Sequence, residues 1–162
     1  MSALVRYTIG IDPGARNTAV ACSDDAFFEP CTLDLGPLKS TSDSEVVEVL
    51  LESLWGLFSD ERVERIVCEA QASWGTEKSE VITARCHLVQ GALQALAFAW
   101  EKDFELVTPM QWKKHYNGGV WRRMSYDENK AWSVRKATEL FGEAYVGRVH
   151  HECEAKLLAC YK

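Results

Sequence analysis

Asp12 lies where a side chain can be held rigidly and still be reached by a ligand. It ends the apolar run 7–11 and is followed by Pro13-Gly14, after which an alternating run resumes at 17–21. This pattern predicts a strand, a tight turn and a second strand, with Asp12 at the mouth of the turn. A carboxylate held there by a sheet is open to a metal ion or a phosphate. Taken alone, the segment is equally compatible with a plain hairpin in which Asp12 is a turn residue.

Three further side chains provide partners for Asp12. Glu69 ends a second apolar run, 63–68, while His151 and Glu154 open the apolar segment 155–161. On a helix, residues three apart share a face, so His151 and Glu154 are expected to point the same way. Oxygen ligands suit Mg²⁺ or Mn²⁺, and one imidazole is compatible with Mn²⁺.

Two such ions about 3.5–4 Å apart are the usual arrangement for in-line displacement at phosphorus, because one activates a water and the other stabilises the leaving oxygen. The sequence therefore predicts a two-metal site for Mg²⁺ or Mn²⁺. We expect its catalytic and metal-binding residues to be Asp12, Glu69, His151 and Glu154.

Hydrophobic periodicity predicts the elements that position these residues. Strands are expected at 5–12, 17–23 and 27–34 as an antiparallel meander, then at 65–69 and 104–107. Helices are expected at 43–58, 78–100, 127–141 and 152–161, with a short helical turn from Pro109 and a loop at 117–119. Ser42 and Glu45 form the sequence signature of a capping box before the first helix. This order predicts an α/β fold, a mixed five-stranded sheet with helices on both faces.

The motifs themselves resemble those of a known family. Ile9-Gly10-Ile11-Asp12-Pro13-Gly14 with Thr18-Ala19, then Cys68-Glu69, then His151-x-x-Glu154-Ala155 follow one another as in RuvC-type Holliday-junction resolvases of the RNase H-like superfamily. The stretch Val107-Thr108-Pro109-x-Gln111-Trp112-Lys113-Lys114 is similar to a segment of its viral and phage-like branch, which includes the poxvirus-type resolvases. The resemblance covers residues 7 to about 161.

This resemblance implies that residues 1–162 form a single RNase H-like nuclease domain. The activity it implies is metal-dependent, structure-specific cleavage of four-way (Holliday) DNA junctions by symmetric nicks. Its last motif departs from the family pattern Asp-x-x-Asp-Ala-Leu, because Glu154 is one methylene longer than Asp and Lys156 replaces Leu. His150 and Glu154 would also share a helix face, but we favour His151 as the ligand because it keeps the three-residue spacing.

A basic segment offers a DNA-binding surface, although the chain carries a net charge of −6. Between Gln111 and Lys136 seven basic residues stand against two acidic ones; they are Lys113, Lys114, Arg122, Arg123, Lys130, Arg135 and Lys136. Aromatic side chains are interleaved with them, at Trp112, Tyr116, Trp121 and Tyr126. This composition favours phosphate contact and stacking on unpaired bases, whereas the simpler interpretation is a solvated face.

Trp74 is a further DNA-binding candidate, because aromatics near this position in the resembled family push into the junction centre. The competing interpretation of Trp74 is a lid over the core. The expected partners are branched DNA and a second copy of the chain, since a four-way junction has approximate two-fold symmetry. The helix at 78–100 is the expected dimer interface, unless it packs wholly against the sheet.

The composition is typical of an intracellular, soluble protein. Six cysteines are scattered without C-x-x-C spacing, which indicates reduced thiols in a reducing compartment rather than disulfides or a zinc site. No signal region and no apolar stretch of transmembrane length is visible, so no membrane partner is expected.

Two other functions remain open from the sequence. The same carboxylates would serve an RNase H-like nuclease acting on RNA or on RNA–DNA hybrids. A junction-binding protein weakened catalytically through Glu154 is the non-enzymatic alternative. A kinase or actin-like ATPase is disfavoured, because the chain lacks a second glycine-rich phosphate loop.

Overall fold

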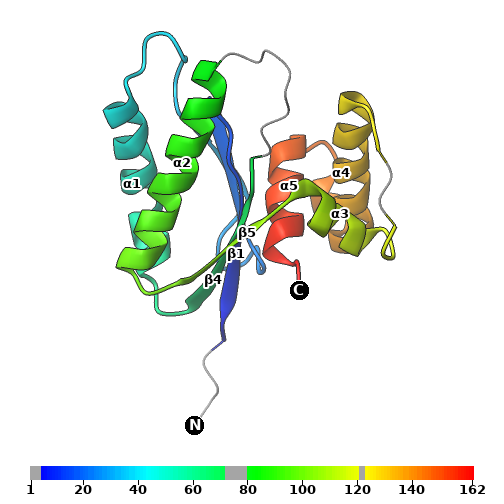
Figure 1. The fold of residues 1–162 in the computed structure, drawn as a ribbon. Coiled ribbons are helices and arrows are strands. Elements are labelled where there is room, and N and C mark those ends of the chain that lie inside the picture. The colour runs from blue at the N-terminus through cyan, green and yellow to red at the C-terminus, as the bar shows by residue number, and fades with distance from the viewer. Residues whose placement is uncertain (1–4, 72–79, 121–122) are drawn as a thin grey trace.

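A mixed five-stranded sheet forms the centre of the structure, a computed structural model that describes residues 5–71, 80–120 and 123–162 (Figure 1). The strands are β1 (Tyr7–Asp12), β2 (Asn17–Cys22), β3 (Cys31–Asp34), β4 (Val63–Glu69) and β5 (Asp103–Val107). Their order is β3-β2-β1-β4-β5. The first three pair antiparallel as the predicted meander, while β4 runs parallel to β1 and β5 runs parallel to β4. The predicted sheet is therefore confirmed.

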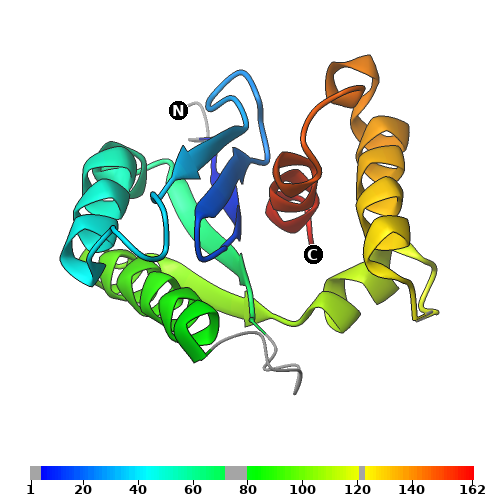
Figure 2. The same cartoon turned by 90° about the horizontal axis from the view of Figure 1, so that it is seen from above.

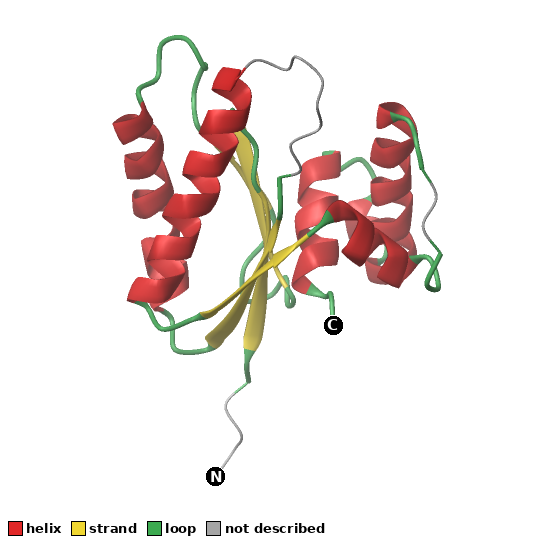
Figure 3. Ribbon diagram, viewed as in Figure 1, coloured by secondary structure: helices red, strands yellow, loops and turns green. Residues whose placement is uncertain are grey.

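Helices cover both faces of this sheet, as predicted (Figures 2 and 3). On one face lie α1 (Asp43–Ser59) and α2 (Glu80–Ala99). The other face is covered by α5 (His150–Ala159), with α3 (Pro109–Tyr116), α4 (Tyr126–Phe141) and a short 3₁₀ turn, η1 (Glu143–Tyr145), beside it. No helix in the described part of the chain is long and apolar enough to cross a membrane.

Local signals in the sequence set where the helices begin. Ser42 and Glu45 form the predicted capping box of α1, and equivalent boxes start α3 at Thr108 and α4 at Ser125. Pro109 occupies the first turn of α3, where its missing N–H leaves no helical bond unmade.

Strand alternation divides the core between the two faces. Successive side chains of a strand point to opposite faces. Accordingly, Ile66 and Cys68 of β4 belong to the cluster under α1 and α2, whereas Val67 between them packs with residues of α3, α4 and α5. The same alternation in β1 turns Ile9 and Ile11 towards α1 and α2. It leaves Gly10 and Asp12 on the face covered by α5.

Gly10 allows α5 to lie directly on β1. A Cβ atom at this position would sit 2.0 Å from the carbonyl oxygen of Ala155 and 2.2 Å from the nitrogen of Ala159. Both contacts are with helix backbone, so no side chain at position 10 can be accommodated without moving α5. This close approach holds the first turn of α5 beside the end of β1.

Several predicted boundaries differ from those of the structure; for example, β1 begins two residues later than predicted and β4 two residues earlier. β3 begins at Cys31 rather than at residue 27, because the amides of Phe27 and Phe28 bond to the carbonyl of Asp24 in a turn. Their apolar side chains suggested a strand but pack against the core instead, with Phe27 stacked on Tyr7. The last helix begins at His150, two residues before the predicted start, and the short turn predicted at Pro109 is a full eight-residue helix.

Candidate active site

Asp12 and Glu69 end the two central parallel strands at the same edge of the sheet. Cys68 of β4 is in register with Ile11 of β1, so the residues that follow them in each strand are neighbours. Strand alternation turns both carboxylates towards α5. Asp12 is 6% exposed and Glu69 is partly buried.

The first turn of α5 completes the group. His151 Nδ1 lies 2.5 Å from Asp12 Oδ2, which joins α5 to the end of β1. Glu154, one turn further on, is 8% exposed and accepts a hydrogen bond of 2.8 Å from the Ser133 hydroxyl of α4. His151 and Glu154 share a face as predicted, because the helix already includes residue 150.

Glu69 is held by side chains from two helices. The indole N–H of Trp112 in α3 donates to Glu69 Oε2 at 2.7 Å, and the Gln90 amide of α2 donates to the main-chain oxygen of Glu69 at 2.8 Å. Gln71 donates to the carbonyl of Pro13 at 2.6 Å and so ties the segment after β4 to the turn after β1. These bonds fix the position of the Glu69 backbone and carboxylate.

Lys113 brings a positive charge into this acidic group. Its ammonium lies 3.2 Å from Glu154 Oε1 and 3.5 Å from Asn129 Oδ1, and the residue is only 6% exposed. A lysine buried beside carboxylates reduces their mutual repulsion, and it remains in reach of an anion that enters the site.

All four predicted metal-binding residues line one cavity of about 500 Å³. Lys113, Arg123 and Lys130 contribute positive charge to its wall, and His150 lies beside His151 there. The buried Asp12 and Glu154 form an acidic floor, and the more exposed Arg123 and Lys130 form a basic rim. This arrangement suits cations bound together with a phosphodiester.

The electrostatics of the carboxylates reflect their crowding. Burial raises the pKa of Glu69 well above its ordinary value, and the charges of Asp12 and Glu154 raise it further. Burial and the Asp12 charge likewise raise the pKa of Glu154, although Lys113 and Ser133 act in the opposite direction. Each of these carboxylates is thus destabilised in its charged form, which a bound cation would reverse.

The two histidines are shifted in opposite directions. The hydrogen bond to Asp12 raises the pKa of His151. Burial, together with the nearby charges of His151 and Lys130, lowers the pKa of His150 to about 4. His150 is consequently neutral at physiological pH, the form in which imidazole binds metals.

The donor set fits the divalent ion predicted from the sequence. Crowded carboxylates with raised pKa values favour a compensating cation; their oxygen atoms suit Mg²⁺ or Mn²⁺, and imidazole is compatible with Mn²⁺. His150, His151 and Glu154 place one ligand atom each within 4.8 Å of one another. The three-residue spacing favoured His151 over His150 as the ligand, and both side chains line the cavity in the structure.

The predicted DNA-binding residues are not all equivalent in the structure. Lys113 is part of the acidic cluster rather than of an exposed patch, while Arg123 and Lys130 line the cavity. Lys114 and Arg135 are exposed, and Lys136 pairs with Glu139 at 2.8 Å. Trp74 and Arg122 lie outside the described residues, so their predicted roles remain predictions.

Three residues of the site were not singled out as site residues from the sequence. Ser133 and Asn129 belong to α4 and are part of no motif; Asn129 lines the cavity beside Lys113, and the packing of α4 against α5 brings Ser133 to Glu154. Trp112 was interpreted as a base-stacking aromatic, but it is fully buried and bonds Glu69.

Comparison with known proteins relates this fold to solved structures. No protein-family model matches the sequence, and no curated protein matches it. Thermus thermophilus RuvC in complex with a Holliday junction substrate matches with a TM-score of 0.70 at 16% identity, over 95% of this chain and 90% of that chain. Another Thermus thermophilus RuvC structure matches with a TM-score of 0.70 at 17% identity, over 94% of this chain and 90% of the other.

A yeast protein gives a further match. The yeast mitochondrial Holliday junction resolvase Ydc2 aligns with a TM-score of 0.61 at 14% identity, over 96% of this chain and 78% of that one. At these identities the similarity establishes the fold. The chain has the RNase H-like α/β fold of RuvC, as the sequence predicted.

Proposed function

We propose that this chain, with the fold of RuvC, is a metal-dependent endonuclease that cleaves four-way DNA junctions by symmetric nicks, with residues 1–162 acting as one nuclease domain. The observation that carries the proposal is the convergence of Asp12, Glu69, His151 and Glu154 from two strands and a helix on one cavity. The shared fold adds support, since the matched proteins are RuvC, in one case with a Holliday junction substrate, and the resolvase Ydc2.

Each residue has a role that its position supports. Asp12, Glu69, His151 and Glu154 would hold Mg²⁺ or Mn²⁺ ions. When bound, the ions lower the pKa of a water nucleophile and stabilise charge on the scissile phosphate. Lys113 stabilises the same negative charge from the cavity wall, and Trp112 and Ser133 keep two of the carboxylates in place.

The DNA would approach the cavity across its basic rim. Arg123 and Lys130 line the opening, and Tyr126 beside them is 65% exposed with the Lys130 ammonium 3.9 Å above its ring. Cations at the rim position phosphates, while an exposed ring offers a surface for an unpaired base. Lys114, Arg135 and Lys136 extend the proposed phosphate-binding surface. From the sequence alone, Arg122 is assigned to the same surface and Trp74 to the centre of the junction.

Two copies of the chain would match the symmetry of a junction. The buried stripe of α2 packs inward, yet Val81 and Phe98 on its other side are 55% and 85% exposed. An exposed phenylalanine on a long helix is the type of side chain that a dimer interface buries. We therefore assign α2 to the interface of a homodimer.

The cysteines favour a reducing compartment as the place of action. All six are free in the structure, four of them buried. Thiols that never pair are typical of proteins kept under reducing conditions.

Cleavage of synthetic substrates tests the proposed function. We expect the protein with Mg²⁺ or Mn²⁺ to cut a four-way junction at paired positions in opposed strands, and to leave a linear duplex of the same sequence intact. Preferential cleavage of an RNA–DNA hybrid would instead assign the chain to the ribonucleases of this fold. Tight junction binding without cleavage under either metal would identify a junction-binding protein.

A further inference from the structure

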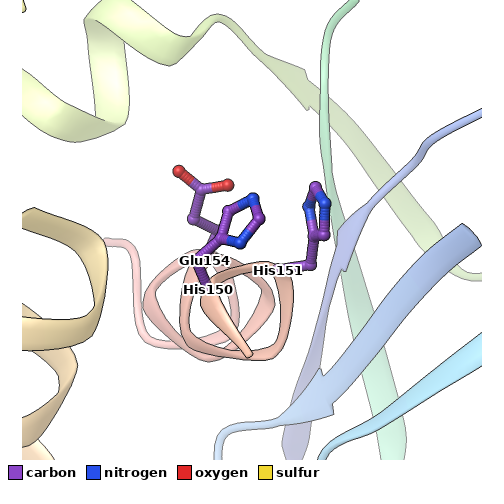
Figure 4. A group of neighbouring side chains, drawn as sticks. All are labelled: His150, His151 and Glu154. Atoms are coloured by element: carbon purple, nitrogen blue, oxygen red, sulfur yellow. The ribbon is translucent and has the colours of Figure 1, made fainter. Parts of the chain in front are cut away.

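His150 is a potential ligand that the motif of the site does not require. It begins α5, immediately before His151, and one turn before Glu154 (Figure 4). The rings of His150 and His151 have centroids 3.8 Å apart at an interplanar angle of 39°. Ligand atoms of these three residues lie within 4.8 Å of one another, close enough to share one ion after small side-chain rotations.

The neighbours of these side chains leave donor atoms for an ion. His151 uses Nδ1 towards Asp12, so its Nε2 remains as a ligand atom, the arrangement in which a carboxylate orients a metal-bound histidine. Glu154 uses Oε1 towards Ser133 and Lys113, which leaves Oε2. Each residue of the three therefore keeps one nitrogen or oxygen for coordination.

The composition of this set discriminates between metals. Mg²⁺ binds mainly through charged oxygen ligands, and here the charge of the only carboxylate of the three is partly offset by Lys113 at 3.2 Å. Imidazole nitrogens carry no charge to be offset, and they raise affinity along the series from Mn²⁺ to Co²⁺ and Zn²⁺. Two imidazoles beside one partly neutralised carboxylate favour these ions over Mg²⁺.

We propose that His150, His151 and Glu154 form a transition-metal site within the active-site cavity, and that His150 makes it selective for Mn²⁺, Co²⁺ or Zn²⁺ over Mg²⁺. The proposal deepens the proposed function, because it specifies the metal class of one of the two ion positions. It concerns binding by the protein alone and does not require that a junction be cleaved.

Measuring metal binding by the protein without DNA tests this proposal. Metal-free protein is titrated with Mn²⁺, free ion being followed by electron paramagnetic resonance, and Mg²⁺ affinity is measured by competition. We expect His150→Gln to weaken Mn²⁺ binding by about tenfold or more, the scale of losses at metal-site residues, and to change Mg²⁺ binding by less than about threefold. His87→Gln, at an exposed position of α2, is the matched control and should leave both affinities unchanged.

A second measurement uses the unmodified protein and is independent of how the variant folds. Substoichiometric Mn²⁺ should broaden the imidazole proton signals of His150 and His151 before those of His87 and His115, the other two of the four histidines. An unbroadened His150 signal, or equal losses of Mn²⁺ and Mg²⁺ affinity in His150→Gln, overturns the proposal. His150-dependent Mn²⁺ binding in a protein that cleaves no junction would uphold the metal site and refute the proposed function. Junction cleavage by a protein whose Mn²⁺ binding does not depend on His150 would uphold the proposed function and refute the metal site.

Discussion

At the scale of single residues, two carboxylates of the cavity accept hydrogen bonds from two different helices. Glu69 accepts from Trp112 of α3, and Glu154 accepts from Ser133 of α4. These donors orient the carboxylates without removing their charge, so the negative charges still raise one another's pKa values. The hydrogen bonds thus hold the carboxylates in place while their proximity is electrostatically unfavourable, which is the condition under which a divalent cation binds and stabilises a fold.

The raised pKa of Glu69 predicts a pH dependence of stability. A carboxyl group whose pKa is higher in the folded than in the unfolded state stabilises the fold below the unfolded pKa, and this contribution is lost as the pH rises through the folded pKa. The metal-free protein should therefore lose stability above the ordinary carboxyl range. Glu69→Gln should flatten this dependence and raise Tm at neutral pH by about 2–4 °C, or about 1 kcal/mol at this length.

Thermal unfolding in EDTA, measured from pH 4.5 to 8 for both proteins, checks this prediction. Glu64→Gln, on the exposed side of β4, is the matched control and should reproduce the wild-type profile. A Glu69→Gln profile parallel to that of the wild type would show that the Glu69 charge is not unfavourable in the fold.

Two adjacent lysines are expected to act in different steps, one in cleavage and the other in DNA binding. Lys113 is buried against Glu154, whereas Lys114 is exposed. Lys113→Met should lower the single-turnover cleavage rate by about 100-fold, the usual effect of losing one group that stabilises transition-state charge, with little change in junction affinity. Lys114→Met should instead weaken binding modestly and preserve the rate at saturating DNA. Equal rate losses in the two variants would count against the role of Lys113.

At the scale of elements, the contact of α5 with β1 determines whether the site exists. His151 contacts Asp12, and Glu154 lines the same cavity, because Gly10 lets the backbone of α5 lie against β1. Gly10→Ala should therefore destabilise the protein by about 1–3 kcal/mol, as overpacking does, and should also weaken Mn²⁺ binding because α5 is displaced.

Gly56→Ala in α1 is the control for that substitution. A Cβ atom at position 56 meets nothing within 4 Å, so alanine there should stabilise the protein by up to about 1 kcal/mol through helix propensity. Denaturant unfolding and Mn²⁺ titration of both variants check the pair. Gly10→Ala with wild-type stability and metal affinity would contradict the close packing of α5 on β1.

Element boundaries that depend on local sequence patterns were predicted closely, whereas a boundary that depends on tertiary packing was not. The start of α1 follows from Ser42 and Glu45, and the strand ends at Asp12 and Glu69 follow from apolar runs that stop at a carboxylate. The predicted start of β3 was wrong, because Phe27 packs against the core from a turn rather than from a strand.

The same distinction applies to the site. Asp12, Glu69, His151 and Glu154 were predicted because strand ends and helical spacing are visible in a sequence. The role of Ser133 was not, because it depends on how α4 packs against α5, which no local pattern encodes. Lys113 was predicted as a phosphate contact, but its burial beside Glu154 is likewise a product of tertiary packing.

At the scale of the whole molecule, the net charge is negative, but positive side chains gather beside the cavity. The chain carries a net charge of −6, yet Arg123 and Lys130 bring positive charge to the cavity rim. Binding of a polyanion by such a protein has to depend on the local patch, and phosphate contacts make affinity fall as salt rises.

Charge reversal at that rim tests this distribution. Arg123→Glu combined with Lys130→Glu should weaken junction binding and reduce the slope of log affinity against log salt by about one unit per lost phosphate contact. Arg6→Glu, just before the start of β1 and at the opposite end of that strand from Asp12, should leave the slope unchanged. Binding isotherms at several salt concentrations give the slopes, and equal slopes for the rim variant and the wild type would reduce the rim to a solvated face.

At the centre of the proposed active site, Asp12 joins the end of β1 to α5 through its contact with His151. Asp12→Asn keeps the shape of the side chain but removes one negative ligand. The direct measurement compares wild type and Asp12→Asn for Mg²⁺- or Mn²⁺-dependent cleavage and for binding of one synthetic four-way junction. We predict that the variant binds the junction within about threefold of the wild type, since rim contacts persist, while cleavage falls by at least about 100-fold. Cleavage retained in Asp12→Asn, or lost only together with junction binding, would contradict the assignment of this cavity as the active site.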